Sequence, residues 1–326
     1  MSADPTARSA MLALARRVRA YFAPVDRSTG IPGVFDPARH GAFDPDAPPA
    51  PWLDLGEIRD FRRSSETKLA ATRSGIMSPP RAQYRAHLDA RLDFQFAEWG
   101  KLQMALSGGS QHLNVLAPDP GGDPAPGGGD ALPAIALQAG STPSQLVVGS
   151  GNVAAFSVGD MVAVDLDYAG QTGYIGSGIA AAYVRTATAI GGDAHYIRRI
   201  TFNVGRVESK NADALLLVQP LLGGVPGASA KVQKVVGFVD REGGSFFQEW
   251  SALFVFSEET GARVALHYPR LQACAPAAES WSELLPPFNS VGLHASFLAL
   301  PVNDALDGEQ ALCYRSFFPA PNAALY

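Results

Sequence analysis

Charged residues, cysteines and catalytic motifs are all scarce in this chain. Charged side chains make up 17% of the 326 residues, below the roughly 25% typical of globular proteins. Hydrophobic residues make up 47%, which excludes disorder over most of the chain because there is ample apolar surface to bury. So little charge on so large a chain predicts that other copies of the same chain cover part of its surface.

The two cysteines, Cys274 and Cys313, are too few for a disulfide framework and stand at no zinc-ligand spacing. We interpret them as core thiols of a protein that is made and folded in a reducing cytoplasm. No stretch approaches the ~18 apolar residues of a membrane span. The net charge of −5 lacks the basic surplus that stable duplex binding normally shows.

Motifs of P-loop, HExxH, GxSxG and Rossmann enzymes are absent from the sequence. The glycine-rich residues 173–178 precede no helix pattern, and so do not predict a phosphate cradle. His87 and His267 could each act as a general base, but no nucleophile or carboxylate stands at a diagnostic spacing. Two acidic clusters, at 165–167 and 304–309, are better explained as turns than as calcium loops. We therefore predict no catalytic residue, no cofactor and no metal.

Residues 57–91 carry eight Lys or Arg against four Asp or Glu. Such a basic stretch could contact phosphate, pair with acidic patches on a neighbouring copy, or form an ordinary solvated surface. It lacks the interleaved exposed aromatics of single-strand binders, and the nucleic-acid interpretation is therefore the weaker one.

The first 56 residues are predicted to form a helix and an extended arm. Residues 5–22 combine apolar side chains with arginines in a pattern typical of a short amphipathic helix. Residues 23–56 hold seven prolines, which exclude helix and central strand. A free linker would not carry large aromatic side chains. We therefore predict that Phe35 and Trp52 anchor this arm on a neighbouring copy.

Residues 57–116 are predicted to form the first half of a mainly β domain. Apolar and polar residues alternate without a break over residues 83–96, which predicts a long strand with one apolar face. Leu92 lies on that face and is a candidate contact between copies, because an unpaired strand edge promotes association. A helix is expected at about 97–107, ended by two glycines.

Residues 117–131 are rich in Pro and Gly and predict a flexible linker. The next hundred residues favour short strands, and the one at 161–165 is entered through a Val-Gly-Asp turn, as in small SH3-like barrels. We therefore predict an inserted small β-barrel domain at 132–230, with strands at 145–148, 161–165, 196–207 and 214–219.

Residues 231–326 are predicted to complete the main domain and to end in a C-terminal arm. A strong hairpin is expected at 246–268, with Gly261 at a position of positive φ, followed by strands at 291–300 and 311–318. Phe246, Phe247 and Trp250 on this hairpin are candidate self-assembly contacts.

Several of these segments together resemble the major tail tube proteins of tailed bacteriophages. The resembling segments are 52–68 (WLDLGEIRDFRRSSETK), the long strand with its helix, 238–254 (FVDREGGSFFQEWSALF), 268–271 (YPRL) and 299–304 (ALPVND). The resemblance covers about 50–116 and 231–318. The insertion at 132–230 departs from the family pattern, and we expect it on the outside of the tube.

The resemblance implies a β-sandwich with a flanking α-helix and a long hairpin. It also implies stacked, hexameric rings that conduct the genome into the host cell without binding it specifically. The expected partners are other copies, terminator and tape-measure proteins, and the expected location is the virion, after assembly in the host cytoplasm. The alternative is a tail-tip or baseplate component whose inserted domain binds a receptor or glycan, or acts as a hydrolase.

Overall fold

A computed structural model describes residues 17–41, 43–73, 80–120, 131–165, 196–243, 246–258, 261–274, 292–304 and 306–320. The protein is mainly β, as predicted, with 50% strand and 10% helix. The chain divides into two compact units. The first unit comprises residues 1–25, 31–109 and 248–326, and the second comprises 26–30 and 110–247.

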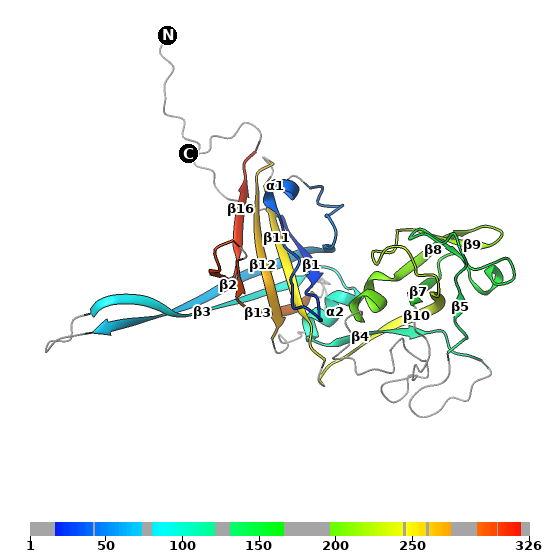
Figure 1. Cartoon of the computed structure of the whole chain (residues 1–326), viewed down its shortest axis with the longest axis horizontal. Coiled ribbons are helices and arrows are strands. Elements are labelled where there is room, and N and C mark those ends of the chain that lie inside the picture. Colours follow the sequence, from blue (N-terminus) through cyan, green and yellow to red (C-terminus); the bar gives the residue numbers. More distant parts are fainter. Residues whose placement is uncertain are drawn as a thin grey trace, which may run out of the picture. The chain divides into compact units, whose positions relative to one another are not determined.

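The first unit is a closed antiparallel barrel of six strands (Figure 1). Its strands are β1 (Arg17–Pro24), β2 (Leu53–Arg73), β3 (Pro80–Phe96), β11 (Glu249–Ser257), β12 (Arg263–Ala273) and β13 (Leu293–Ala299). They follow the order β11-β1-β2-β3-β13-β12, and β12 pairs again with β11. The β-sandwich that the resemblance implies is not confirmed, since here one sheet closes on itself.

Three short strands complete the first unit. β16 (Tyr314–Phe318) pairs with residues 263–267 of β12, beside the place where β13 pairs with residues 271–273. β14 (Val302–Asn303) and β15 (Gln310–Ala311) form a small separate hairpin.

Aromatic side chains fill the barrel. The rings of Phe94 and Phe297 stack with their centroids 5.7 Å apart, and Phe22 lies 5.5 Å from Phe297 and 6.0 Å from Phe254. Large rings suit this position because a small barrel has an interior that side chains must fill completely.

The first described segment is a strand and not the predicted helix. In β1, Ala20, Tyr21, Phe22 and Ala23 are all fully buried. Phe22 contacts the aromatic interior, while Tyr21 and Ala23 pack against the arm on the outer face. Because both faces are covered, apolar residues occur in a run without the alternation of a half-buried strand. The helix prediction is therefore wrong for residues 17–22, and residues 5–16 lie outside the described part.

The proline-rich arm packs on its own unit. It contains the short helix α1 (Pro37–His40), which Asp36 caps. Phe35 and Trp52 are each only 4% exposed. They belong to one apolar cluster with outward-facing residues of the barrel: Tyr21, Ala23, Leu253, Val255 and Ala265. The prediction that Phe35 and Trp52 reach a neighbouring copy is therefore wrong, because their own barrel buries them.

Most of the regular patterns of the first unit are confirmed. β3 contains the predicted long strand: Ala90, Leu92, Phe94 and Phe96 are buried, and the residues that alternate with them are exposed (Asp89, Arg91) or partly exposed (Asp93, Gln95). The helix α2 (Lys101–Gly108) ends at Gly109, which has φ 59°, and Leu102 and Leu106 are buried on it. The hairpin β11–β12 is present, but β12 continues past Pro269 to Ala273.

The second unit is a separate, smaller sheet. Its strands are β4 (Gln111–Leu116), β5 (Ile135–Ala136), β6 (Gln145–Val147), β7 (Met161–Asp165), β8 (Val204–Lys210), β9 (Ala214–Leu217) and β10 (Lys231–Arg241). They follow the order β4-β10-β7-β8-β9-β6, with β5 paired to β10. The N–H of Leu137 donates to Ala230 O over 2.9 Å and that of Gln138 to Val147 O over 2.8 Å, which links the β10 side of the sheet to β6.

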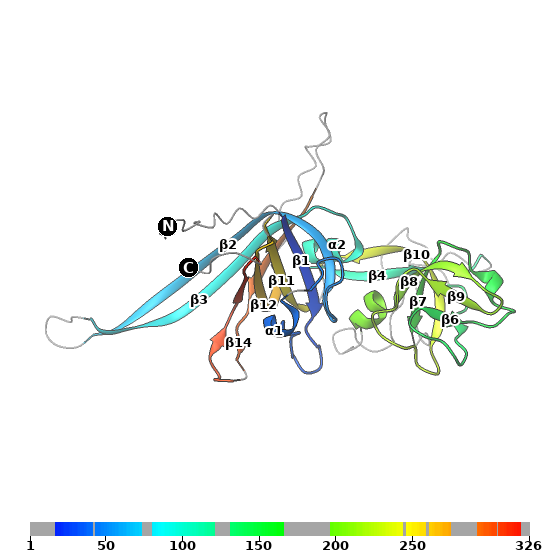
Figure 2. The same ribbon diagram turned by 90° about the horizontal axis from the view of Figure 1, so that it is seen from above.

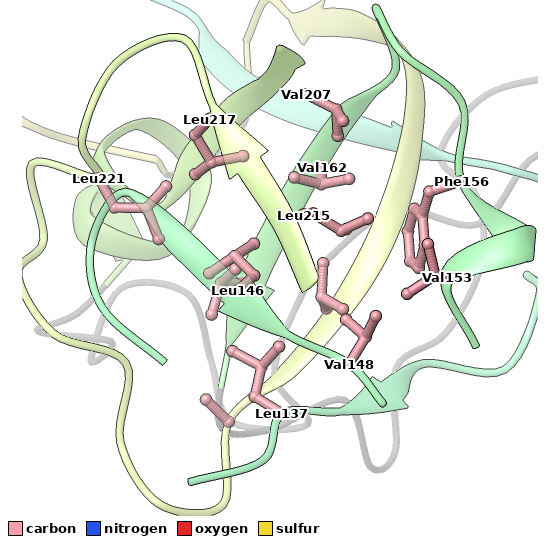
Figure 3. Packing of buried hydrophobic residues seen from close by; sticks show 13 residues of the cluster. Leu137, Leu146, Val148, Val153, Phe156, Val162, Val207, Leu215, Leu217 and Leu221 are labelled. Carbon is pink, nitrogen blue, oxygen red and sulfur yellow. The ribbon is translucent and has the colours of Figure 1, made fainter. Parts of the chain in front are cut away.

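Aliphatic side chains from these strands point toward one another in a single core (Figure 3). Val162, Leu215 and Val232 are fully buried in it, and Phe156 is its one aromatic member in the described part of the chain. A 3₁₀ turn at Val153–Ala155 leads into Phe156.

The second unit is wider than the inserted domain that the sequence predicts. β4 and β10 belong to it, because β10 pairs with β4, β5 and β7. The boundaries therefore fall near 110 and 247, and not at the predicted 132 and 230. The strand predicted at 196–207 is wrong in its first half, where a π-helix (Arg198–Phe202) precedes β8. Of the predicted linker, residues 121–130 lie outside the description, and Pro118 and Ala131 form an isolated bridge.

Candidate self-assembly surface

The two longest strands of the first unit form a hairpin that extends beyond the barrel (Figure 2). β2 and β3 pair from Ile58 opposite Phe96 to Arg73 opposite Pro80. β1 covers β2 only as far as Ile58, and β13 covers β3 only from Arg91 onward. Residues 60–73 and 80–90 therefore form a two-stranded ribbon, called the ribbon below. In the part of the chain that is described, no strand pairs with its outer edges.

A β-bulge lies where the ribbon leaves the barrel. β2 has one extra residue between Arg59 and Arg62 relative to β3, and Asp60 there has φ 53°, in the left-handed region that few residues other than glycine adopt. Phe61, inside the bulge, turns toward the barrel, and its ring centroid lies 4.9 Å from that of Phe254. The bulge thus anchors the base of the ribbon in the aromatic core.

Most described side chains of the ribbon are exposed, among them Arg62, Thr67, Lys68 and Asp89. A two-stranded hairpin by itself is at best marginally stable in water. The N–H and C=O groups along an unpaired edge are also a template for another strand. The ribbon therefore offers two long unpaired edges on which a strand of a second chain could pair.

The charged residues toward the outer end of the ribbon are all basic. Residues 68–87 contain four basic residues, Lys68, Arg73, Arg81 and Arg85, and no Asp or Glu. The whole chain has a net charge of −5, so the remaining residues carry −9. A segment of +4 on a chain that is otherwise −9 is complementary in charge to the rest of another copy.

Two of the predicted contact residues lie in the barrel core. Leu92 is fully buried, with Arg63 opposite it on β2 and Phe297 opposite it on β13. Trp250 is buried beside Phe22, with their ring centroids 6.5 Å apart. The prediction that these two side chains contact another copy is therefore wrong.

The other two predicted contact residues follow β10 in the second unit. The ring of Phe246 lies 5.2 Å from that of Tyr196 and 5.0 Å from the guanidinium of Arg27, so it packs within its own unit. Phe247 is 47% exposed, and it stays a predicted contact.

The sequence offers Asp165 as a cation ligand, but the structure gives this carboxylate another role. Its Oδ2 lies 3.0 Å from Nη1 of Arg199, and both side chains are buried. The guanidinium also lies over the ring of Tyr196, whose hydroxyl donates to His112 O over 2.6 Å. Burial raises the pKa of Tyr196. Asp167 and the glycine-rich residues 173–178 lie outside the described residues.

Among the residues that the structure describes, a buried serine and histidine form an arrangement that resembles part of a catalytic site. Ser251 Oγ lies 3.1 Å from Nε2 of His267 and donates to Gly33 O over 2.7 Å. Nε2 also lies 3.3 Å from Gly33 O. Because a carbonyl oxygen only accepts, Nε2 must carry the proton and cannot remove one from the serine. Burial lowers the pKa of His267 to about 4, and the pair serves to fix the arm on the barrel.

Within the described residues no group of three His, Cys, Asp or Glu side chains could hold a metal ion. In the same part of the chain no helix is long and apolar enough to cross a membrane. The side chain of His87, the other candidate base, is not described; its backbone pairs with Lys68 in the ribbon.

No protein-family model matches the chain, and no curated protein matches its sequence.

Proposed function

We propose that the protein is a structural subunit that assembles with copies of itself through the ribbon. The observation that carries this proposal is the combination of two unpaired strand edges with a purely basic outer segment on an otherwise acidic chain. Strand edges supply main-chain hydrogen bonds to a neighbour, and charge complementarity selects an acidic one.

We further propose that the assembly is a tail tube of a tailed bacteriophage, made of stacked rings that conduct the genome into the host. The resemblance in sequence supports this assignment. A closed barrel with the flanking helix α2 and one long hairpin supplies the parts that such a subunit needs. The acidic remainder of the chain suits a conduit, because DNA has to slide through it without adhering.

The rival proposal is a tail-tip or baseplate component with a binding or hydrolytic second unit. A glycan-binding surface would show exposed Trp or Tyr rings, whereas in the described part of the second unit the large exposed apolar side chains are mostly aliphatic: Val158, Val218, Leu222, Val225 and Val236, with Phe238 and Phe247. Among the described residues, the hydrogen-bonded side chains of Ser251 and His267 lie under the arm of the first unit and not in the second. The tube assignment is therefore better supported.

Shortening the ribbon tests the proposal. Thr67 and Leu88 lie directly opposite each other, so an Asn-Gly turn can replace residues 68–87 and close a shorter hairpin in the same register. We expect the purified wild-type protein to form rings or tubes in negative-stain images, and the shortened variant to sediment as a folded monomer. Rings of normal diameter from the shortened variant would contradict the proposal.

A matched control separates strand pairing from charge. Replacing Lys68, Arg73, Arg81 and Arg85 by Gln keeps the length of the ribbon. If pairing of the edges drives assembly, this variant still forms rings, with a weaker dependence on salt than the wild type. If the ribbon instead binds nucleic acid, both variants lose duplex binding in a mobility-shift assay while the wild-type protein stays monomeric.

A further inference from the structure

A small acidic turn of the first unit presents a fully exposed leucine. β14 and β15 are joined by residues 304–309, seen at the β14 end in Figure 2. Leu306 in this turn is 97% exposed, the highest value among the large hydrophobic side chains that the structure describes. Asp304, Asp307 and Glu309 surround it in sequence, and the turn contains no Lys or Arg.

Hydrogen bonds fix the shape of this turn. Asp304 Oδ1 accepts from the N–H of Leu306 over 2.9 Å, and its Oδ2 accepts from the hydroxyl of Tyr314 over 2.7 Å. Asp307 accepts from the N–H of Glu309 over 2.9 Å. The bonds to Leu306 and Tyr314 lower the pKa of Asp304. We call residues 304 and 306–309 the knob. It holds one apolar side chain in water on a turn whose charged residues are all acidic, and because the turn is already ordered, binding costs little further conformational entropy.

The second unit contains a pocket with the complementary character. It has a volume of about 350 Å³, and its walls include Met161, Phe202, Val218 and Leu222 together with Arg206. None of its lining residues is acidic. Val218 and Leu222 are 54% and 63% exposed, so apolar surface is open to solvent at this site. Arg206 uses one N–H to bond Gly159 O over 2.8 Å, and a guanidinium carries five such donors.

We propose that the knob of one copy enters the pocket of the next copy, with Leu306 against the apolar wall and a carboxylate of the knob paired with Arg206. The partner is a second copy, because the apolar tip and acidic residues of the knob match the apolar wall and basic side chain of the pocket. The inference rests on the proposed function, since it names a contact of the same self-assembly. It also gives the second unit a part in assembly, whereas the sequence analysis places the inserted domain on the outside of the tube.

The geometry of this contact bears on the form of the assembly. The knob and the pocket are different surfaces of one chain, so the contact is heterologous. Such a contact repeats from copy to copy and produces a closed ring or an open filament. The contact is independent of the ribbon in sequence and in the residues that form it.

Sedimentation velocity of the full-length protein over a range of concentrations tests the contact. Leu306→Ser removes the apolar tip and Val218→Glu places a carboxylate at the pocket. Each is expected to raise the dissociation constant of self-association by roughly tenfold or more, the effect of losing an interface anchor. Val225→Glu is the matched control: Val225 is 69% exposed and does not line the pocket, and this variant should associate like the wild type.

A charge exchange separates a direct contact from an indirect effect. Asp307→Arg and Arg206→Glu should each weaken association, and the double variant should recover most of the loss because the pair is restored in reverse. Wild-type assemblies together with unchanged association of Leu306→Ser overturn the knob contact and leave the proposed function standing. A wild-type protein that stays monomeric at every concentration overturns the proposed function itself.

Discussion

The two units bury different kinds of side chain. The barrel of the first unit is filled by phenylalanine rings, among them Phe22, Phe94 and Phe297, whereas the core of the second is aliphatic apart from Phe156. The difference follows from construction. Six strands closed into a barrel enclose an interior that large side chains must fill, and an aromatic residue buries about 150–250 Å². The shorter strands of the second unit enclose a smaller interior, which Val and Leu fill.

The two units also differ in tryptophan content, which lets fluorescence distinguish them. All four tryptophans of the sequence, Trp52, Trp99, Trp250 and Trp281, fall within the bounds of the first unit, and the second contains none. Tryptophan fluorescence during denaturation therefore reports on the first unit alone.

The largest effect on stability is expected from truncating a side chain of the aromatic core. Phe94→Ala should lower the free energy of unfolding of the first unit by about 3–5 kcal/mol, because the ring of Phe94 packs against Phe61, Phe254 and Phe297. The measurement is a denaturant titration followed by tryptophan fluorescence.

A control in the other core sharpens the same test. Leu215 is fully buried in the second unit, and Leu215→Ala should cost about 2–5 kcal/mol there. The loss of stability should appear as an earlier unfolding transition in far-ultraviolet circular dichroism. The transition followed by tryptophan fluorescence should stay at the same denaturant concentration. A shift of the tryptophan transition as large as that of Phe94→Ala would mean that the two units unfold as one.

A smaller effect is expected from pH, again in the first unit only. The pKa of His267 falls from 6.5 to about 4 on burial, so the folded state binds the proton less readily than the unfolded state. The resulting stability is complete above pH 6.5 and is lost as the pH falls from 6.5 to 4. The loss amounts to about 3 kcal/mol. The imidazole of His267 packs against the rings of Phe35, Trp52 and Tyr314 and contacts the hydroxyl of Ser251.

The comparison of wild type with His267→Gln isolates this contribution. Other groups titrate in both proteins, so the difference in the slope of unfolding free energy against pH belongs to His267. We expect the slope between pH 4 and 6.5 to be shallower in the variant. Equal slopes would show that the imidazole is accessible to solvent in the folded state.

The sequence predicts those strands that face solvent on one side. β3 is an example, because its inner residues Leu92, Phe94 and Phe96 alternate with polar ones. The strands β11 and β7 are buried along most of their length, and here turn residues and apolar runs predict the hairpin β11–β12 and the strand β7 without such an alternation. In these places local pattern and tertiary burial agree.

The sequence does not predict elements whose environment depends on distant segments. β1 reads as a helix because the arm covers its outer face, so that its apolar residues are consecutive. Phe35 and Trp52 look like anchors for another chain because nothing local shows that Leu253 and Ala265 receive them.

The ribbon shows the same limit at the candidate site. β2 carries little apolar alternation along residues 60–73, so its sequence gives no strand signal of its own. The available signal was indirect: a strand as long as the predicted one at 83–96 needs a partner of similar length. The basic character of the segment was visible from the sequence, but its two unpaired edges were not.

The smallest effect is expected from two glycines of the second unit, Gly159 in a turn and Gly237 in β10, that have different backbone conformations. Gly159 has φ +90°, and Gly237 has no positive φ; an added Cβ would meet nothing within 4 Å at either position. Gly159→Ala should therefore lower the unfolding free energy by about 1–2 kcal/mol, the cost of forcing an L-residue into the left-handed region. Gly237→Ala should be neutral or stabilise by up to about 1 kcal/mol, since alanine reduces the conformational entropy of the unfolded chain. Thermal unfolding followed by circular dichroism measures both variants under the same conditions. Equal effects of the two substitutions would mean that the turn before β7, predicted from its Val-Gly-Asp sequence, does not require the glycine.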